Sequence, residues 1–458
     1  MSAWFPRVTL HSLVVAISVL IYVLTTRVER ERRPPSIAIA WVLGMIAVPY
    51  LALPTYLLFG RRKLPRKVLQ SSGVLAHCAH WAEDLIESFG LAPSAPSPVR
   101  MHENGEESAA ALFSTMSSAA ERLDISTYIL GNDPFGREAM QRMIERARSG
   151  VQVRFLIDGV GALQLPHACL RHLNTAGIQT AIFSPLLARK TQGPRNLRNH
   201  RKMVIADGAQ LWAGGRNLAA EYFIGLKGAK PWGDLSFDLQ GPVAAAAAAQ
   251  FEADWVAAGG KPAAAAGASP RVDPSMPQCD GGRAQFLPSG PDQAEDTVHA
   301  LLIDACFHAR ERLLVVTPYF VPDTSLETAM RLAAHRGVKI DLCIPAVSNH
   351  RLADFARNRA LRALATAGVN IHLLPYMNHA KAMVFDESLA ISGSVNLDSR
   401  SLLLNYECAV VFYGAREIDW LANWIQALIP AAQPFDPRAP GLLRDIGEGL
   451  LLTVAYQL

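Results

Sequence analysis

The chain has 458 residues, of which half are hydrophobic, so it is long enough for two or three domains with sizeable cores. Its formal net charge of +4 is mildly basic, which fits an anionic partner without requiring one. The six cysteines, at positions 78, 169, 279, 306, 343 and 408, show no CxxC or paired spacing. This argues against a metal site or a disulfide framework and fits reduced thiols in a cytoplasmic setting.

Two long apolar runs open the chain, and together they predict an amino-terminal transmembrane hairpin within residues 1–67. The run at 8–26 is interrupted by His11, and the run at 34–60 carries no charged residue. Each is long enough to cross about 30 Å of hydrocarbon at roughly 1.5 Å per residue. Pro49 and Pro54 leave open a kinked or re-entrant second segment.

The flanks of the two runs bear on processing and orientation. A cleaved signal peptide is the alternative for the first run, but only Arg7 precedes it and no small-x-small site follows. Six basic residues lie outside the hairpin and four in its connector, which favours both ends in the cytoplasm. The outer residues are Arg7, Arg61, Arg62, Lys63, Arg66 and Lys67, and the connector residues are Arg27, Arg30, Arg32 and Arg33. The block after the second run also suits anionic headgroups.

Residues 68–98 are predicted to link the hairpin to the rest of the chain. A helical pattern runs from about 74 to 94, with Trp81, Leu85 and Ile86 on its apolar side, and a Pro-rich boundary ends at Pro98. Two similar halves follow at 99–258 and 283–435. A Gly/Ala/Pro-rich linker at 259–282 joins them, and a tail at 436–458 ends the chain.

The similarity of the halves is an internal repeat of strand and turn segments. The pairs are 125–130 with 314–320, 150–158 with 337–345, and 176–178 with 367–369. In each half strands precede helices, predicted at 137–149 and 326–336, so an α/β sheet with helices packed on it is expected. The Ala run at 244–249 predicts a further helix. The apolar residues from 442 onward fit either a core helix or a helix that contacts a membrane.

One spacing, His-x-Lys-x4-Asp, occurs once in each half. Its members are His200, Lys202 and Asp207 in the first half and His379, Lys381 and Asp386 in the second. The apolar residues after each lysine indicate strands, in which residues two apart share a face. An imidazole beside an ammonium group suits a phosphate, because the lysine supplies charge and the histidine supplies a nucleophile or a proton.

Each motif is followed by a Gly-rich return that ends in an asparagine, Asn217 or Asn396. If each hairpin has a two-residue turn, His200 faces Gly215 and His379 faces Ser394. Small residues there admit a ligand, and the asparagine can donate a hydrogen bond. Asp207 lies seven residues from His200, roughly 23 Å along a strand. Both motif aspartates are therefore expected to have a structural role in the turns.

The paired motifs resemble the phospholipase D superfamily. More narrowly, residues 289–292, 317–323 and 396–401, together with the amino-terminal hairpin, resemble bacterial cardiolipin synthases over roughly residues 36 to 430. One motif alone would be weak evidence, whereas two copies with matched returns are specific. The resemblance implies an α/β fold of two similar phospholipase D-like sandwich halves, each a mixed sheet flanked by helices. The halves would be related by a pseudo-twofold axis and share one site.

The chemistry then divides between the histidines. One attacks a phosphodiester to form a phosphohistidine, and the other protonates the leaving alcohol and later acts as a base on the acceptor. The resemblance implies that His200 attacks and that His379 is the general acid and base. The phosphoryl oxygens would be held by Lys202, Lys381, Asn217 and Asn396. Neither a metal nor another cofactor is expected.

Further residues are assigned around this centre. Glu407, 28 residues after His379, matches the family's acidic partner position, and the corresponding candidate for His200 is Asp234, with Asp238 as the alternative. The first half carries a 12-residue insertion, because 22 residues separate Gly177 from His200 but only 10 separate Gly368 from His379. The insertion, around 188–198, is either a solvated basic loop or a headgroup-binding element. The candidate substrate contacts are Arg195, Arg198, Arg201, Gly215 and Ser394, and the insertion also holds Arg189 and Lys190.

The resemblance implies transfer of a phosphatidyl group from one phosphatidylglycerol to another, giving cardiolipin and glycerol at the inner (plasma) membrane. The expected partners are membrane phospholipids and not nucleic acid, and the oligomeric state stays open. Alternatives are a phospholipase D that hydrolyses lipid, a synthase with phosphatidylethanolamine as donor, and an inactive membrane lipid-binding protein. A nuclease is disfavoured because a soluble nuclease needs no anchor.

Overall fold

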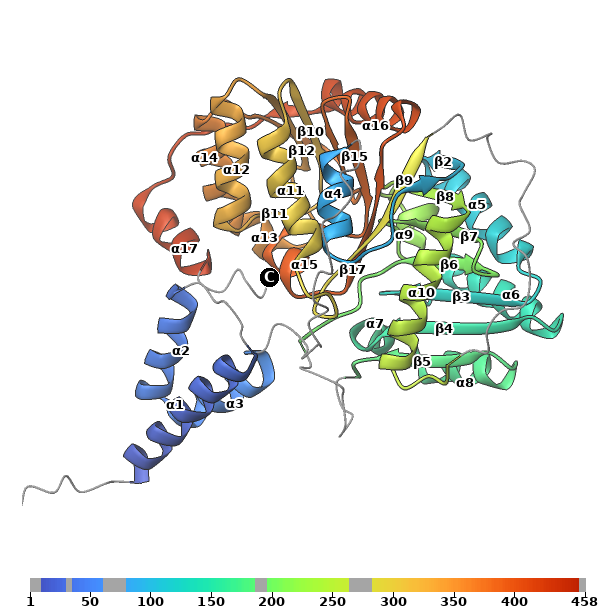
Figure 1. Cartoon of the computed structure of the whole chain (residues 1–458), viewed down its shortest axis with the longest axis horizontal. Coiled ribbons are helices and arrows are strands. Elements are labelled where there is room, and N and C mark those ends of the chain that lie inside the picture. Colours follow the sequence, from blue (N-terminus) through green and yellow to red (C-terminus); the bar gives the residue numbers. More distant parts are fainter. Residues whose placement is uncertain (1–9, 30–34, 61–79, 186–195, 263–281, 453–458) are drawn as a thin grey trace, which may run out of the picture.

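The computed structural model describes residues 10–29, 35–60, 80–185, 196–262 and 282–452 (Figure 1). Its first part is a group of three helices, α1 (Leu10–Glu29), α2 (Pro35–Ala47) and α3 (Pro49–Phe59). They pack around Tyr56, whose hydroxyl lies 2.7 Å from Thr25 Oγ1 and whose ring contacts Tyr22 and Trp41 edge-on. Among the helices of the described ranges, we find none with the length and hydropathy of a membrane span.

The second apolar run forms two helices, α2 and α3, rather than one. Val48 has an extended φ of −141° and separates α2 from α3. Pro49 occupies the first position of α3, where its fixed φ is helical. An N–H at this position would have no acceptor within the helix, so its absence costs no hydrogen bond. Pro54 lies inside α3. The sequence left open a kinked or re-entrant second segment, and the structure shows two helices separated at Val48.

The first half is built on a seven-stranded mixed sheet in the order β2-β8-β7-β6-β3-β4-β5. The strands are β2 (Val99–His102), β3 (Arg122–Thr127), β4 (Gln152–Asp158), β5 (Gln179–Phe183), β6 (Met203–Ala206), β7 (Gln210–Gly214) and β8 (Ser236–Gln240). The helices are α5 (Gly105–Ser118), α6 (Pro134–Arg148), α7 (Gly159–Gln164), α8 (His167–Thr175), α9 (Ala220–Phe223) and α10 (Pro242–Ala257). The predicted helices at 137–149 and 244–249 are confirmed as α6 and α10. Asp133 caps α6 by accepting the Gly136 N–H at 2.8 Å, which fixes its start.

The second half contains a nine-stranded sheet in the order β1-β9-β17-β15-β14-β10-β12-β13-β18 and a separate pair, β11-β16. The strands are β1 (Ala95–Pro96), β9 (Arg283–Ser289), β10 (Arg312–Val316), β11 (Phe320–Val321), β12 (Lys339–Pro345), β13 (Asn370–Leu374), β14 (Ala382–Phe385), β15 (Leu389–Gly393), β16 (Leu397–Asp398), β17 (Glu407–Phe412) and β18 (Gln433–Pro434). The helices are α11 (Thr297–His308), α12 (Thr324–His335), α13 (Arg351–Ala356), α14 (Asn358–Thr366), α15 (Ser399–Leu403), α16 (Ala415–Leu428) and α17 (Leu442–Leu452), with a 3-10 turn at Ile429–Ala431. The helix predicted at 326–336 is confirmed as α12.

The repeat is confirmed by the strand orders. The order β8-β7-β6-β3-β4-β5 in one sheet corresponds to β17-β15-β14-β10-β12-β13 in the other, with three parallel strands at the same end of each. One hydrophobic core contains side chains from both sheets and includes the edge-to-face rings of Phe237 and Phe412, 5.5 Å apart. Each sheet also has its own core under its outer helices. The shared core joins the halves into an α/β sandwich pair.

The segment before the first half belongs structurally to the second. The helix predicted near 74–94 is described as α4 (Trp81–Ser88), which lies beside α11 in Figure 1, and its Ala82 and Ile86 are buried in the second half's own core. In the Pro-rich boundary, β1 pairs with β9. The amino-terminal part of the prediction, 74–79, lies outside the described residues, as do 263–281 of the predicted linker. In the tail, α17 packs on α13 and α14, where Arg362 pairs with the buried Glu448 at 2.5 Å.

Candidate active site

The two motif hairpins have the same register, which differs by one residue from the prediction. Ala206 pairs with Gln210 and Phe385 with Leu389, so each turn has three residues rather than two. Asp207 and Asp386 take left-handed conformations, with φ of 51° and 50°, and two further residues follow before the strand pairing resumes. The predicted facing pairs, His200 with Gly215 and His379 with Ser394, are therefore wrong. The histidines and lysines lie in extended segments just before β6 and β14.

The motif aspartates hold these turns to the neighbouring strand. The Asp207 carboxylate accepts the N–H groups of Ala120, Glu121 and Arg122, each at 2.8 Å. Asp386 accepts three N–H groups from residues 310–312 at 2.8 to 2.9 Å. Three charge-assisted hydrogen bonds leave each carboxylate with no evident chemical role. This geometry supports the structural role expected of both aspartates.

Backbone contacts between the halves bring the motifs together. Asn199 forms a parallel bridge with Tyr406, and the His200 N–H donates to the Tyr406 carbonyl at 2.8 Å. Gly233 forms the equivalent bridge with Asn378, and the His379 N–H donates to the Gly233 carbonyl at 2.6 Å. The segment before each motif therefore runs beside the acid-bearing segment of the opposite half.

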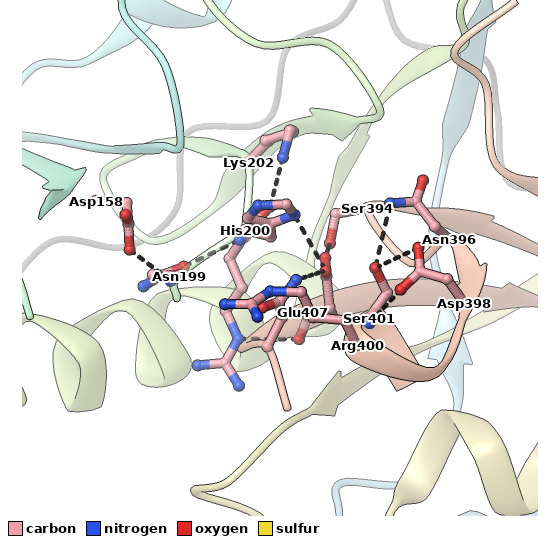
Figure 2. A network of polar contacts seen from close by, with 12 residues as sticks. Asp158, Asn199, His200, Lys202, Ser394, Asn396, Asp398, Arg400, Ser401 and Glu407 are labelled. Carbon is pink, nitrogen blue, oxygen red and sulfur yellow. Dashed lines mark hydrogen bonds and ion pairs between the residues drawn. The ribbon is translucent and has the colours of Figure 1, made fainter. Parts of the chain in front are cut away.

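The consequence is a crossed pairing of histidines and acids. His200 Nδ1 lies 3.3 Å from Glu407 Oε1, and His379 Nδ1 lies 2.9 Å from Asp234 Oδ2 (Figure 2 shows the His200 pair). This corrects the assignment of Glu407 to His379 and of Asp234 to His200, because the cross-half bridges place each acid against the other half's imidazole. The alternative candidate, Asp238, pairs with His102 instead.

Both acids are fully buried, yet they remain ionised. Burial alone would raise the pKa of Glu407, but the adjacent His200 and the charge of Lys202 lower that pKa below its usual value. Likewise burial opposes ionisation of Asp234, and the hydrogen bond and charge of His379 together with Lys381 outweigh it, so the pKa of Asp234 is lowered. Each carboxylate can therefore fix the Nδ1–H tautomer of its histidine and leave Nε2 as the reactive atom.

Gly215 and Ser394, at equivalent places in the returns, support the acids. A Cβ at Gly215 would lie 2.3 Å from Asp234 Oδ1, so only glycine leaves room for that carboxylate. Ser394 Oγ donates to Glu407 Oε2 at 2.5 Å, as Figure 2 shows. The predicted substrate contact by these two residues is thus corrected, since their neighbours are the carboxylates.

The lysines are buried beside the histidines. Lys202 Nζ donates to the His200 carbonyl at 2.7 Å, and Lys381 Nζ lies 2.7 and 3.1 Å from the two ring nitrogens of His379. Burial lowers the pKa of Lys202, and it lowers the pKa of Lys381 to about 7. Burial, with the charge of Lys381, lowers the pKa of His379 to about 4, and burial also lowers the pKa of His200. An anion entering the site would relieve this concentration of buried positive charge.

The charges of the first motif act on the second motif as well. The charge of Lys202, from the first half, contributes to lowering the pKa values of both His379 and Lys381, in the second. Glu407 in turn acts on both lysines. The motifs of the two halves therefore form one electrostatic unit. Among the described residues, no cluster of His, Cys, Asp and Glu side chains has an arrangement that could hold a metal ion.

The two asparagines occupy equivalent positions. Asn217 Nδ2 donates to the Tyr222 hydroxyl at 2.8 Å, and Asn396 Nδ2 donates to Ser401 Oγ at 3.1 Å. Asn396 Oδ1 is buried and has no hydrogen-bond partner among the described residues. Their contact with phosphoryl oxygens stays a prediction.

Two of the arginines predicted to contact substrate are structural. Arg201 is fully buried and donates to the Glu407 carbonyl, to Asp254, and to the Ser289 carbonyl and Asp292 of the second half. Arg198 donates to Asp158 at 3.3 Å and to the Ser184 carbonyl at 2.7 Å. Both predictions are corrected, because these guanidinium groups are engaged by internal acceptors. Arg195, Arg189 and Lys190 lie outside the described residues.

Comparison with known proteins identifies the family of the chain. The sequence model of a family described as "Cardiolipin synthase, PLD-like domain" matches residues 112–255 and 302–429, more than half of the chain. The chain belongs to this family. A second one, described as "Phospholipase_D-nuclease N-terminal", matches residues 14–61.

Individual relatives cover nearly the whole chain. Cardiolipin synthase A of Pseudomonas aeruginosa (strain LESB58) is 31% identical over 465 residues, covering 95% of this chain and 93% of the relative. Cardiolipin synthase A of Pseudomonas fluorescens (strain SBW25) is 29% identical over 395 residues, covering 81% of each. The crystal structure of phosphatidylserine synthase from Haemophilus influenzae Rd KW20 superposes with a TM-score of 0.62 at 13% identity, over 82% of this chain and 99% of that one. That likeness shows the fold alone.

Within this cardiolipin synthase family fold, several neighbours of the histidines were missed by sequence reasoning. The Tyr128 ring lies 4.0 Å from the His200 ring, and the Tyr222, Trp232 and Tyr319 rings lie 5.1, 6.0 and 6.2 Å from the His379 ring. Arg400 donates to the Asn196 carbonyl at 2.6 Å, and its charge contributes to lowering the pKa of His200. The repeat offered a weak signal for Tyr128 and Tyr319, since one follows Thr127 directly and the other follows the equivalent Thr317 by two residues.

Proposed function

We propose that this protein is a membrane-anchored phosphatidyltransferase that makes cardiolipin from two phosphatidylglycerol molecules through a phosphohistidine. The observation that carries the proposal is the crossed pair of buried His-acid contacts, flanked by two buried lysines in one electrostatic unit. Membership of the cardiolipin synthase family supports the lipid substrate and the transfer reaction.

In the first step, His200 Nε2 attacks the phosphorus of the donor. Glu407 holds Nδ1 and thereby leaves the Nε2 lone pair available. A P–N bond forms while the bond from phosphorus to the headgroup glycerol oxygen breaks, and His379 gives its proton to that oxygen. Glycerol leaves, and the phosphatidyl group stays on His200. Lys202, Lys381, Asn217 and Asn396 would stabilise the added negative charge on the phosphoryl oxygens.

In the second step, a second phosphatidylglycerol takes the place of glycerol. His379 removes the proton from its terminal hydroxyl, the oxygen attacks phosphorus, and the P–N bond breaks. Cardiolipin leaves and His200 is regenerated. His379 must gain and lose a proton in each cycle, and its pKa of about 4 in the empty site is too low for an acid at neutral pH. The bound phosphodiester anion offsets the lysine charges and raises that pKa, which makes the acid function depend on substrate.

The same proposal assigns the three amino-terminal helices to the membrane. Leu10, Leu20 and Leu51 are more than half exposed, as are other apolar residues of α1 to α3, and lipid would cover them. A multi-pass anchor in the inner membrane, with the catalytic part in the cytoplasm, would place the site at the leaflet that contains its substrate. A protease-protection assay on spheroplasts with a tag after residue 452 would test this orientation.

The decisive assay supplies purified full-length protein in detergent with phosphatidylglycerol as the only lipid. We expect glycerol and cardiolipin to appear in equal molar amounts. Phosphatidic acid without cardiolipin would instead identify a hydrolase, and binding without any product would identify an inactive lipid-binding protein. His200→Ala and His379→Ala serve as matched controls for product formed by contaminants.

A further inference from the structure

Exposed apolar side chains are concentrated at one edge of the two sheets. Among the described residues after Gly60, ten large hydrophobic side chains are exposed, and six of them follow strand ends on the edge where the motif histidines lie. These six are Leu163, Ile224, Leu226, Val347, Leu352 and Tyr376. Two of the others, Phe307 and Leu332, lie toward the ends of helices that lead to the opposite edge.

Part of this apolar set is continuous with the His379 side of the site. The Pro345↔Leu374 register makes Val347 and Tyr376 follow adjacent parallel strands, and the Ala346 N–H donates to the Leu374 carbonyl at 2.8 Å. The Tyr376 ring packs on Gly233, since a Cβ there would lie 3.5 Å from Tyr376 Cε2. Gly233 immediately precedes Asp234, the partner of His379.

The loop 224–231 projects beside this patch and is tightly built. Its base is closed by the Trp232 N–H, which donates to the Glu221 carbonyl at 2.8 Å. Gly225 and Gly228 take positive φ of 78° and 81°, and a Cβ at Gly225 would lie 2.4 Å from the Ala229 carbonyl oxygen. The two turns present Leu226, which is 54% exposed.

Two lysines follow the exposed leucine in the loop. Lys227 and Lys230 are both exposed and have no ion-pair partner among the described residues. An apolar tip with basic neighbours is suited to a bilayer that contains anionic lipid, because the leucine enters hydrocarbon while the ammonium groups stay with the phosphates. A protein partner would have to match a surface that combines loops from both halves.

We propose that loop 224–231, with Val347, Leu352 and Tyr376, forms a docking rim on an anionic phospholipid bilayer. Leu226 inserts below the headgroups, and Lys227 and Lys230 contact lipid phosphates. The rim rests on the proposed function, in which the substrates are lipids that stay in the bilayer. Docking at the rim would bring the headgroups of those lipids to His379. It is separate from the amino-terminal helices, which would anchor the chain without orienting the site.

The test compares two forms of substrate for the full-length chain. Leu226→Asp should raise the KM for phosphatidylglycerol in mixed vesicles, expressed as mole fraction, about tenfold or more. With short-chain phosphatidylglycerol below its micellar concentration, its activity should stay within about twofold of the unaltered protein. Leu332→Asp, an equivalent change at the opposite edge, should leave both activities unaltered. A normal vesicle KM for Leu226→Asp, or an equal loss on monomeric substrate, would overturn the rim.

A measurement without turnover separates this proposal from the proposed function. In protein whose reactive native cysteines are replaced, a fluorophore on Leu226→Cys should be quenched by brominated acyl chains of anionic vesicles, and one on Leu332→Cys should not. Equal quenching at both positions, or none at 226, would contradict docking. If the unaltered protein forms no cardiolipin while quenching at 226 persists, the proposed reaction fails and the lipid-docking surface stands.

Discussion

The two halves of the site place the same His-Lys pair in different surroundings. Near His200 lie Tyr128 and the guanidinium group of Arg400, whereas His379 is surrounded by the rings of Tyr222, Trp232 and Tyr319. The two histidines also differ in exposure, since the side chain of His200 is 21% exposed and that of His379 8%.

The difference is sharpest four residues after each asparagine. Asn217 and Asn396 each donate to a hydroxyl five residues later, so the segments after them correspond, and the fourth residue is Glu221 in one and Arg400 in the other. Duplication has therefore preserved the contacts that hold the motif while the surrounding charges have diverged. This teaches that two identical pairs can take unequal parts in a reaction, as a nucleophile and a general acid require.

The largest expected effect comes from removing either imidazole. His200→Ala and His379→Ala should each reduce cardiolipin formation by at least about 10³-fold, and the double variant should be no worse than the more damaged single one, because the two act as a unit. Rates of product formation under saturating phosphatidylglycerol give the comparison. If the double variant lost activity by the product of the two single losses, the histidines would act independently, in two separate sites.

The crossed acids provide the next test. Glu407→Gln and Asp234→Asn should each slow turnover by about 10²-fold or more by disturbing the tautomer of one histidine. Because Glu407 contacts His200 and raises its pKa, replacing Glu407 should lower the pKa of His200 more than that of His379. The pH dependence of diethylpyrocarbonate modification, read for each histidine by peptide mass, measures this. A larger pKa change at His379 than at His200 in Glu407→Gln would restore the uncrossed pairing.

The turn aspartates should affect stability rather than chemistry. Asp207→Ala and Asp386→Ala each remove three charge-assisted hydrogen bonds and put alanine in a left-handed conformation, which should cost about 3 kcal/mol of the free energy of unfolding. The matching asparagine variants tolerate that conformation and keep one acceptor oxygen, so they should lose less. Denaturant unfolding measures both pairs, and a catalytic defect in a fully stable variant would contradict the structural role.

The smallest effect concerns the divergent charges. The charge of Arg400 contributes to lowering the pKa of His200, so Arg400→Gln should raise that pKa and shift the acid limb of the pH-rate profile to higher pH. On the acid limb, kcat/KM of Arg400→Gln should fall below that of the unaltered protein, by a smaller factor than the losses expected for the crossed acids. Glu221→Gln is the matched control at the corresponding position and should leave the acid limb in place. Equal shifts of the acid limb in both variants would show that Arg400 and Glu221 do not differ in their effect on His200.

The sequence predicted much of this architecture for physical reasons. Alternating apolar runs and capped helices are local signals, so the repeat, α6, α10 and α12 were predictable. The apolar residues after each lysine predicted a strand there, and β6 and β14 begin directly after Lys202 and Lys381. The sequence left open a kinked or re-entrant second apolar segment, because a proline disturbs a helix without showing whether the helix bends or ends there.

Other features depended on contacts between distant segments. The crossing of Glu407 and Asp234 arises from backbone bridges between the halves, and residue spacing within one half cannot reveal it. The hairpin register depended on three N–H groups from a strand some 85 residues away, which hold Asp207 in a left-handed conformation. Arg201 looked available for substrate because its acceptors, Asp254 and Asp292, lie far along the chain.

The central claim is that His200 and His379, from different halves, act on one phosphorus atom. A phosphatidyl ester with a nitrophenol leaving group tests it directly, because that group departs without a proton from His379. His379→Ala should release one equivalent of nitrophenolate per protein, then stall, with the phosphatidyl group found on His200 by peptide mass spectrometry. Continued turnover in His379→Ala, or an equal burst in His200→Ala, would contradict the claim.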